Sequence, residues 1–129
     1  MIRPAHNQHN LNRFVDAQDP VYRQVMTELR SGLKLTHWMW FIFPQITGLG
    51  SSTMTIKYSI SSLAEARAYI EHELLGPRLI ECTRQVNDIN GRTIKRILGP
   101  TDCEKFRSSM TLFSRATLEN NVFEAALHK

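Results

Sequence analysis

The sequence predicts an all-α fold: a compact single-domain bundle of about six or seven short helices with one Gly/Ser-rich loop. Three observations support this fold class. Apolar residues recur along most of the chain at the spacing of three and four that places them on one face of a helix. Capping residues and Gly-Pro or Asn-Gly pairs divide these repeats into short segments. No second convincing strand is found with which a first strand could pair.

Two helices are predicted at the start of the domain. Asp19-Pro20 combines a capping side chain with a proline at the first helical position, and Gly32 is a typical helix end. The apolar residues between them recur every four positions, at Val21, Val25 and Leu29. The shorter helix before this one has its apolar positions at Leu11, Phe14 and Val15.

Further helices follow in the middle of the chain. Ser62-x-x-Glu65 is a capping box that opens a helix, and Gly76-Pro77 ends that helix and starts the next. Asn90-Gly91 ends this next helix in turn. The apolar stripe of the first helix is Leu63, Ala66 and Ile70, and that of the second is Leu79, Cys82, Val86 and Ile89.

The last part of the chain continues in the same way. A short amphipathic segment precedes the turn Gly99-Pro100, and Thr101-x-x-Glu104 is a second capping box. The apolar positions are Ile94, Ile97 and Leu98 in the short segment, Phe106, Met110 and Phe113 in the helix after the box, and Val122, Phe123, Ala126 and Leu127 in the last helix.

Two segments lack the helical pattern. Residues 35–43 are nearly all apolar, which fits either a buried strand or a short helix that is apolar all round. We favour a short helix that is capped by Thr36 and ends before Pro44. Residues 48–58 are rich in Gly, Ser and Thr and are predicted to form an irregular loop, where binding groups are often found.

Composition bounds the class of protein. With 129 residues the chain fits one domain, which we place at residues 11–129 after a flexible tail of residues 1–10. The net charge of +4 favours an anionic ligand only mildly, and the basic residues form no block of the kind that nucleic-acid binding would favour. Cys82 and Cys103 are far apart, so neither a disulfide framework nor a zinc site is indicated.

Cellular location and metal content are also predicted from the sequence. The polar N-terminus and the short apolar run WMWFIF predict a cytoplasmic protein with no membrane insertion. We expect a monomer or weak homodimer without a cofactor. No metal is expected either, because His6 and His9 belong to the tail and His72 and His128 are isolated.

Three stretches resemble a known family. They are HWMWFIFPQITGLGSS, SLAEARAYIEHELLGPRLIECT and EKFRSSMTLF, in this order and spacing. They resemble the signatures of domain-of-unknown-function family eighteen-ten, small bacterial proteins sometimes labelled calpastatin-like. The resemblance covers roughly residues 11–127 and implies a compact all-α fold with no established activity. It implies no protease inhibition, because a calpastatin is expected to be disordered and this composition is that of a folded domain.

The aromatic segment holds the first candidate site residues. His37 can act as acid, base or anion donor in a pocket, and it is the candidate catalytic residue. The alternative is a neutral core histidine bonded to a backbone carbonyl. Trp40 would share a helix face with His37 and could stack on a ligand, or simply pack. Gln45, just after Pro44, offers a donor and an acceptor to a ligand or to the loop itself.

The loop and two later helices complete the candidate set. Gly48-x-Gly50-Ser51-Ser52 could converge on a phosphate, although it lacks the lysine of a P-loop, and Tyr58 follows within reach. Arg78 could bind an anion or pair with a nearby glutamate. The remaining candidates share one side of a later helix, either as an anion site or as small residues for close packing: Lys105, Ser108 and Ser109.

Three functions are compatible with these residues. The leading hypothesis is a cleft that binds, or binds and transforms, a small anionic and nucleotide-like metabolite. The second is a protein-interaction module that exposes rings of the aromatic segment or of the last helix. The third is a nucleic-acid binder, which requires the basic residues to share a face. Those basic residues are Arg13, Arg23, Arg30, Arg84, Arg92, Lys95 and Arg96.

Overall fold

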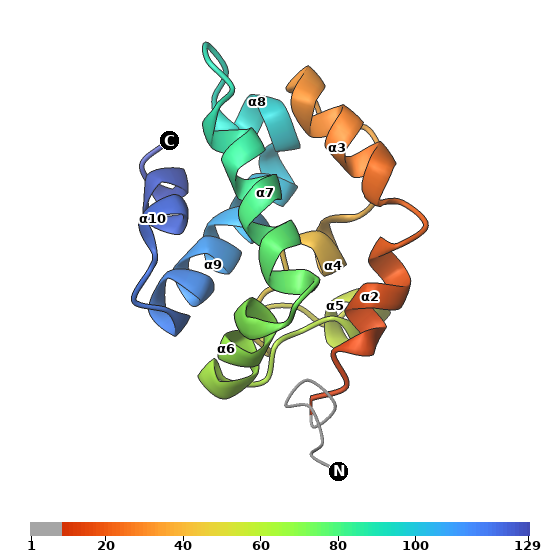
Figure 1. Cartoon of the computed structure of the whole chain (residues 1–129). Coiled ribbons are helices and arrows are strands. Elements are labelled where there is room, and N and C mark those ends of the chain that lie inside the picture. The colour runs from red at the N-terminus through yellow and green to blue at the C-terminus, as the bar shows by residue number, and fades with distance from the viewer. Residues whose placement is uncertain (1–8) are drawn as a thin grey trace.

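The computed structural model describes residues 9–129, and its regular secondary structure in this range is helical (Figure 1). The predicted all-α single domain is therefore confirmed. The predicted tail, residues 1–10, falls almost entirely outside the described residues. The helices are α2 (Asn12–Gln18), α3 (Tyr22–Ser31), α4 (Met39–Ile42), α5 (Thr53–Lys57), α6 (Leu63–Glu71), α7 (Leu75–Asn87), α8 (Ile94–Leu98), α9 (Pro100–Ala116) and α10 (Asn121–Leu127).

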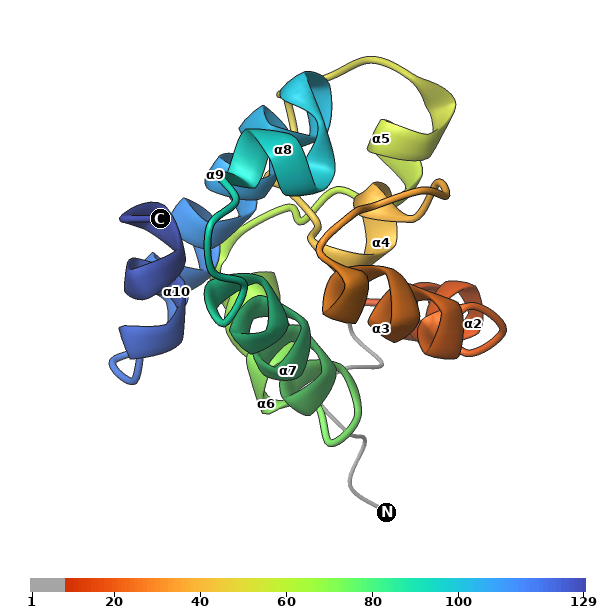
Figure 2. The same cartoon turned by 90° about the horizontal axis from the view of Figure 1, so that it is seen from above.

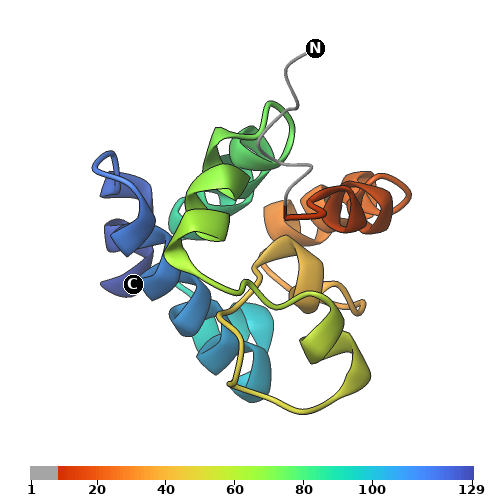
Figure 3. The same cartoon turned by 90° about the horizontal axis from the view of Figure 1, so that it is seen from below.

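Helices α7 and α9 organise the bundle. Helix α7 packs against α3, α6 and α10, and α9 packs against α4, α6, α8 and α10. Seen from above, α6 and α7 lie between α2 and α3 on one side and α10 on the other (Figure 2). Seen from below, the chain after α4 runs beside α8 and α9 before it reaches α5 at the edge of the molecule (Figure 3).

Aromatic side chains from distant segments meet in the core. The Phe14 and Tyr69 rings lie 5.1 Å apart edge to face, and Tyr69 is 5.2 Å from Phe113. Phe43 meets Phe106 edge to face at 4.9 Å. These rings join α2, α6 and α9 with the segment after α4. The stripe predicted for α9 is confirmed, because Phe106, Met110 and Phe113 are fully buried.

The joint between α6 and α7 depends on a close backbone approach. A Cβ atom on Gly76 would lie 1.9 Å from the carbonyl oxygen of Ile70. The backbone N–H groups of Leu74 and Leu75 donate to Nδ1 of the buried His72 at 3.0 and 3.2 Å. The His72 ring thus supports the turn, and Gly76 lies in the first turn of α7 rather than ahead of it.

One of the predicted helix signals is confirmed in full and another in part. Gly32 ends α3 with a φ of 76°, a left-handed conformation that favours glycine. The Ser62 hydroxyl accepts the N–H of Glu65, as a capping box requires. The Glu65 carboxylate completes no box, however. It accepts from Ser61 at 2.8 and 2.7 Å and from Arg13 at 2.8 Å instead.

Other predicted caps are wrong. Helix α3 begins at Tyr22, and Asp19 is instead the C-cap of α2. Helix α9 begins at Pro100 after Gly99, so Thr101 lies inside its first turn and makes no cap. Thr36 does not cap α4 either, because its hydroxyl donates to Glu28 at 2.6 Å.

The Gly/Ser-rich segment is more ordered than predicted. Residues 48–58 include the short helix α5, where the Ser52 hydroxyl accepts the N–H of Thr55 at 3.1 Å. A parallel bridge between Ile46 and Ile60 closes the ends of this segment. Within residues 9–129, no helix is long and apolar enough to cross a bilayer.

Candidate functional site

A buried carboxylate anchors the aromatic segment. Glu28 on α3 is 2% exposed and accepts hydrogen bonds from the Leu35 N–H at 2.7 Å, the Thr36 N–H at 3.0 Å and the Trp38 indole at 3.0 Å. Burial alone would raise the pKa of Glu28, but hydrogen bonds, those from Thr36 foremost, outweigh it and lower the pKa to about 2. Glu28 is therefore a charged structural anchor.

A second buried polar group holds the other end of the segment. The amide of Gln18 donates to the Phe41 carbonyl at 2.7 Å and to the Tyr69 hydroxyl at 3.0 Å. Arg78 donates to the Gln18 side chain at 3.3 Å and pairs with Asp19 at 2.9 Å. The predicted anion-binding residue Arg78 thus has internal partners in a structural network.

His37 lies outside this anchored structure. Its side chain is exposed and has no hydrogen-bond partner among the described residues, so the alternative of a neutral core histidine bonded to a backbone carbonyl is wrong. Helix α4 begins only at Met39, and His37 and Trp40 therefore share no helix face. His37 lines no described pocket, whereas the half-buried Trp40 has the Lys105 ammonium 5.4 Å from its ring centre.

A polar pocket forms where the loop after Pro44 meets α5 and the first half of α9. Its volume is about 300 Å³. Three of the predicted site residues, Gln45, Lys105 and Ser108, line it together. The complete lining is Gln45, Leu49, Gly50, Thr55, Thr101, Glu104, Lys105 and Ser108. The Gly/Ser-rich segment therefore contributes through Gly50 and Thr55 rather than through its serines.

Backbone contacts fix the loop wall of this pocket. The Ile60 N–H donates to the Gln45 carbonyl at 2.8 Å, and the Thr47 N–H donates to the Ile60 carbonyl at 2.8 Å. Gly50 allows the loop to approach α5, because a Cβ there would lie 2.8 Å from a methyl carbon of Thr55. The position of Gln45 beside α9 thus follows from pairing between segments on either side of α5.

The Asp102 carboxylate beside the pocket is shared unequally by two lysines. Asp102 pairs with Lys34 at 2.8 Å and lies 3.8 Å from the Lys105 ammonium. Because Asp102 lies closer to Lys34, it neutralises Lys105 only in part, and Lys105 also lines the pocket. Glu104 adds one carboxylate, and the rest of the polar lining consists of hydroxyls and an amide. Such a lining suits an anion that also carries hydrogen-bond donors.

The other predicted ligand-binding residues lie outside the pocket. Ser51 is exposed, and the Ser52 hydroxyl caps α5. Tyr58 is buried, with its ring 5.4 Å from that of Phe41. Ser109 is completely buried, and its hydroxyl has no partner among the described residues. These four predicted residues therefore do not line a shared cavity.

Sequence reasoning missed several residues of the lining. Thr101 lies four residues before Lys105 on α9, so helical spacing could have placed it beside Lys105. Glu104 is adjacent to Lys105 in sequence and lines the same pocket. Thr55 gave no signal, because its position depends on α5 and on the approach at Gly50.

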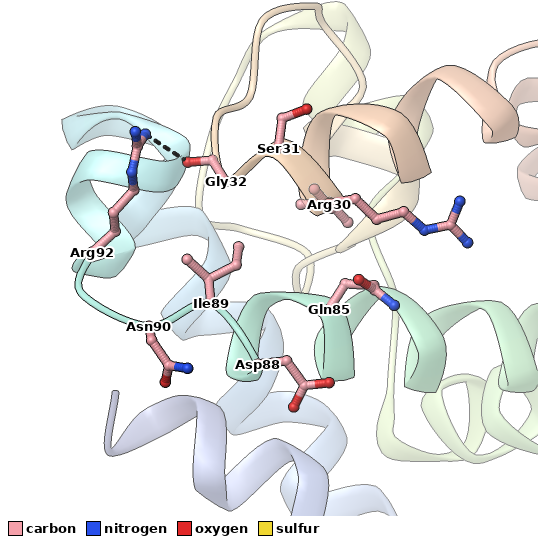
Figure 4. A pocket seen from close by; sticks show the side chains of 9 residues that line it. Arg30, Ser31, Gly32, Gln85, Asp88, Ile89, Asn90 and Arg92 are labelled. Carbon is pink, nitrogen blue, oxygen red and sulfur yellow. Dashed lines mark hydrogen bonds between the residues drawn. The ribbon is translucent and has the colours of Figure 1, made fainter.

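A second polar depression, between the C-terminal ends of α3 and α7, is less suited to an anion (Figure 4). Arg92 donates to the Gly32 carbonyl at 3.1 Å, and the Arg30 guanidinium points away from Arg92 in Figure 4. Helix C-termini present carbonyl oxygens, which repel anions. Of the basic residues of the nucleic-acid hypothesis, Arg84 lines another depression and Arg13 pairs with Glu65.

No metal site is found in the described part of the chain. No group of three or more His, Cys, Asp or Glu side chains within residues 9–129 could hold a metal ion. Both cysteines are free and buried. Burial raises the pKa of the Cys82 thiol to about 12, so this thiol is protonated at neutral pH.

This fold and pocket define a single-domain helical protein with a polar depression between an ordered loop and the start of its longest helix. The family model described as "Protein of unknown function (DUF1810)" matches residues 8–129, and the chain belongs to this family, as its three motifs indicated. It is similar to the conserved hypothetical protein Rv1873 from Mycobacterium tuberculosis, known from a crystal structure. That similarity has 60% sequence identity and a TM-score of 0.91, and it covers 92% of this chain and 85% of that chain. Comparison with curated proteins gives no match.

Proposed function

We propose that this protein binds a small anionic metabolite in the polar pocket, and that the metabolite is nucleotide-like in combining a phosphate with hydroxyl groups. The observation that carries this proposal is the convergence of two distant motifs. Gln45 from the aromatic segment and Lys105 and Ser108 from α9 line one cavity of about 300 Å³. This volume is at the lower end of the range for small-molecule sites.

Each lining residue has a role in this proposal. The Lys105 ammonium attracts the phosphate, and hydroxyls of Ser108 and Thr101 donate to its oxygens. The Glu104 carboxylate accepts from hydroxyl groups of the ligand. Gln45 can donate to and accept from the same polar edge. Because Trp40 lies below Lys105, its fluorescence should report occupancy of the pocket.

Binding is better supported than catalysis. The candidate acid-base residue His37 is exposed outside the pocket, and the described lining includes neither histidine nor cysteine. Among residues 9–129, the Ser108 hydroxyl forms no hydrogen bond to a side chain that could act as its base. A serine nucleophile requires such a base within reach. The pocket therefore has groups for recognition and no activated nucleophile.

The test is an NMR titration with AMP and inorganic phosphate, with adenosine as the uncharged control. We expect AMP to shift the amide signals of Thr55, Thr101 and Ser108 and adenosine to shift them far less. The Lys105→Met variant should bind AMP at least tenfold more weakly, which corresponds to about 1.4 kcal/mol. Lys95→Met is the matched control, because Lys95 is an exposed lysine on α8 that lines no described pocket.

Two outcomes would reject the proposal. The first is the absence of shifts at these amides with millimolar AMP or phosphate. The second is binding that is weakened equally by Lys105→Met and Lys95→Met, since this would indicate a general charge effect rather than a pocket.

A further inference from the structure

We infer that the ligand of the polar pocket also carries an aliphatic chain, which lies in an apolar groove that continues from the pocket along α9. This inference rests on the proposed function, because it places the anionic group of the same ligand at Lys105. The chemical class it names is an alkyl- or acyl-bearing phosphate or related anion.

The groove adjoins the pocket directly. It has a volume of about 460 Å³ and shares Leu49, Glu104 and Ser108 with the polar pocket. Its other lining residues come from the loop, the start of α6 and the second half of α9: Ile46, Leu63, Arg107, Thr111, Leu112 and Arg115. The two depressions are therefore neighbouring halves of one surface, with the polar half toward the start of α9.

Three exposed aliphatic side chains lie at this groove. Leu49 is 55% exposed, Leu63 is 41% exposed and Ile46 is 36% exposed, while Leu112 is buried. A single exposed leucine needs no explanation in a folded protein. Three exposed aliphatic side chains around one groove, two from the loop after α4 and one from α6, do call for an explanation, because burying them against a ligand is favourable by about 25 cal/mol per Å².

The charges around the groove favour an anionic occupant. Arg107 and Arg115 line it, and neither forms an ion pair with any of residues 9–129. Their aliphatic stems can extend the apolar wall while the guanidinium groups remain in water. Glu104, at the junction with the polar pocket, is the one carboxylate in the described lining. An amphipathic anion therefore fits this surface better than a cationic or neutral amphiphile.

The combined surface fits one small molecule that spans both halves. An anionic group at Lys105 and Ser108 would direct a chain past Leu49 toward Leu63 and Leu112. The volumes of the two halves lie within the range of small-molecule sites, so a chain of medium length is sufficient. Linking the two parts in one ligand should raise the affinity well above that of either part alone.

The probes are inorganic phosphate, hexyl phosphate, hexanol and hexyltrimethylammonium, each titrated by NMR. We expect hexyl phosphate to bind at least tenfold more tightly than inorganic phosphate and to shift the amides of both Ser108 and Leu63. Leu63→Ser should remove most of this advantage without changing the affinity for inorganic phosphate. Leu118→Ser is the matched control, because Leu118 is a fully exposed leucine that lines a different depression.

The outcomes separate this inference from the proposed function. If inorganic phosphate binds at Lys105 and the hexyl chain adds no affinity, the inference is overturned and the proposed function stands. Equal binding of hexanol, or of the cationic probe, would overturn the inference as well. If hexyl phosphate occupies the groove while Lys105→Met changes neither its affinity nor that of phosphate, both proposals fail.

Discussion

Residues 35–43 and residues 45–58 are neighbours in the chain but are held in opposite ways. In the first region, rings are buried, and polar partners from α2 and α3 hold Thr36, Trp38 and Phe41. The second region is tied mainly at its ends, by the bridge of Ile46 with Ile60, and exposes most of its side chains. In the first region, the Thr36 hydroxyl and the Trp38 indole have an internal partner in Glu28, and only the His37 side chain is exposed among its polar groups with no such partner. In the second region, the Ser52 hydroxyl caps α5, whereas Gln45 and Thr55 line the pocket.

Removing the anchor of the first region should have the largest effect. Glu28→Ala leaves the buried Trp38 indole and the backbone N–H groups of Leu35 and Thr36 without their acceptor. We expect a loss of about 3–5 kcal/mol in the free energy of unfolding, measured by urea denaturation. Glu81→Ala, at an exposed glutamate on α7, should cost less than about 0.5 kcal/mol. A loss below 1 kcal/mol for Glu28→Ala would contradict its role as an anchor.

The same anchor predicts a pH dependence. The pKa of Glu28 falls from 4.5 to about 2 in the folded state, so folding stabilises its charged form. A depressed folded pKa contributes stability above the unfolded pKa, and this stability is lost as the pH falls from about 4.5 toward 2. The contribution is roughly 3 kcal/mol at one pKa unit per 1.36 kcal/mol. The pKa of Glu65 is lowered in the same direction, because hydrogen bonds from Ser61 and Arg13 outweigh burial.

Urea unfolding at pH 7, 4.5 and 3 would measure this contribution. The parent chain should lose stability most steeply below pH 4.5. Glu28→Gln, which cannot titrate, should be less stable at pH 7 and should have a shallower pH dependence. Parallel curves for the two proteins would mean that Glu28 does not account for the acid sensitivity.

Glycine-to-alanine substitutions compare how tightly the α6–α7 joint and the loop are packed. A Cβ on Gly76 would meet the Ile70 backbone oxygen at 1.9 Å, and Gly76→Ala should cost about 2–3 kcal/mol because two packed helices must separate. A Cβ on Gly50 would meet only the Thr55 side chain, at 2.8 Å. We expect Gly50→Ala to cost less than about 1 kcal/mol in thermal or urea unfolding. Equal losses would show that the loop is as tightly packed as the α6–α7 joint.

The sequence predicted those features that depend on a local period. The stripe of α9 and the left-handed end at Gly32 follow from spacing and residue type, and both are confirmed. The role of Glu28 as an anchor has no such signal. Gln24 is its partner at helical spacing, but the groups that it holds in the aromatic segment lie seven to ten residues away. The short helix α5 was missed because Gly, Ser and Thr are poor helix formers, and a capping serine and the bridge stabilise it instead.

The candidate site was predictable to the same extent. Lys105 and Ser108 follow from helical spacing, and their approach to Gln45 depends on tertiary structure. The burial of Ser109 could have been predicted. It lies three residues after Phe106 and four before Phe113, which places it on the apolar stripe of α9. Its position on the apolar stripe distinguishes Ser109 from Ser108. Ser109 faces the core, and Ser108 faces the pocket.

The smallest effect is expected for His37→Ala, although His37 lies inside the most apolar run of the sequence. His37 precedes the N-cap of α4 and therefore lies outside the helix. Its side chain is exposed between Thr36 and the buried Trp38. Truncation removes no hydrogen bond from the described structure, and the free energy of unfolding should change by less than about 0.5 kcal/mol. A loss above 1 kcal/mol would place the ring in the anchored region. An unchanged stability, together with unchanged AMP binding, would mean that His37 belongs neither to the anchored region nor to the pocket at Lys105.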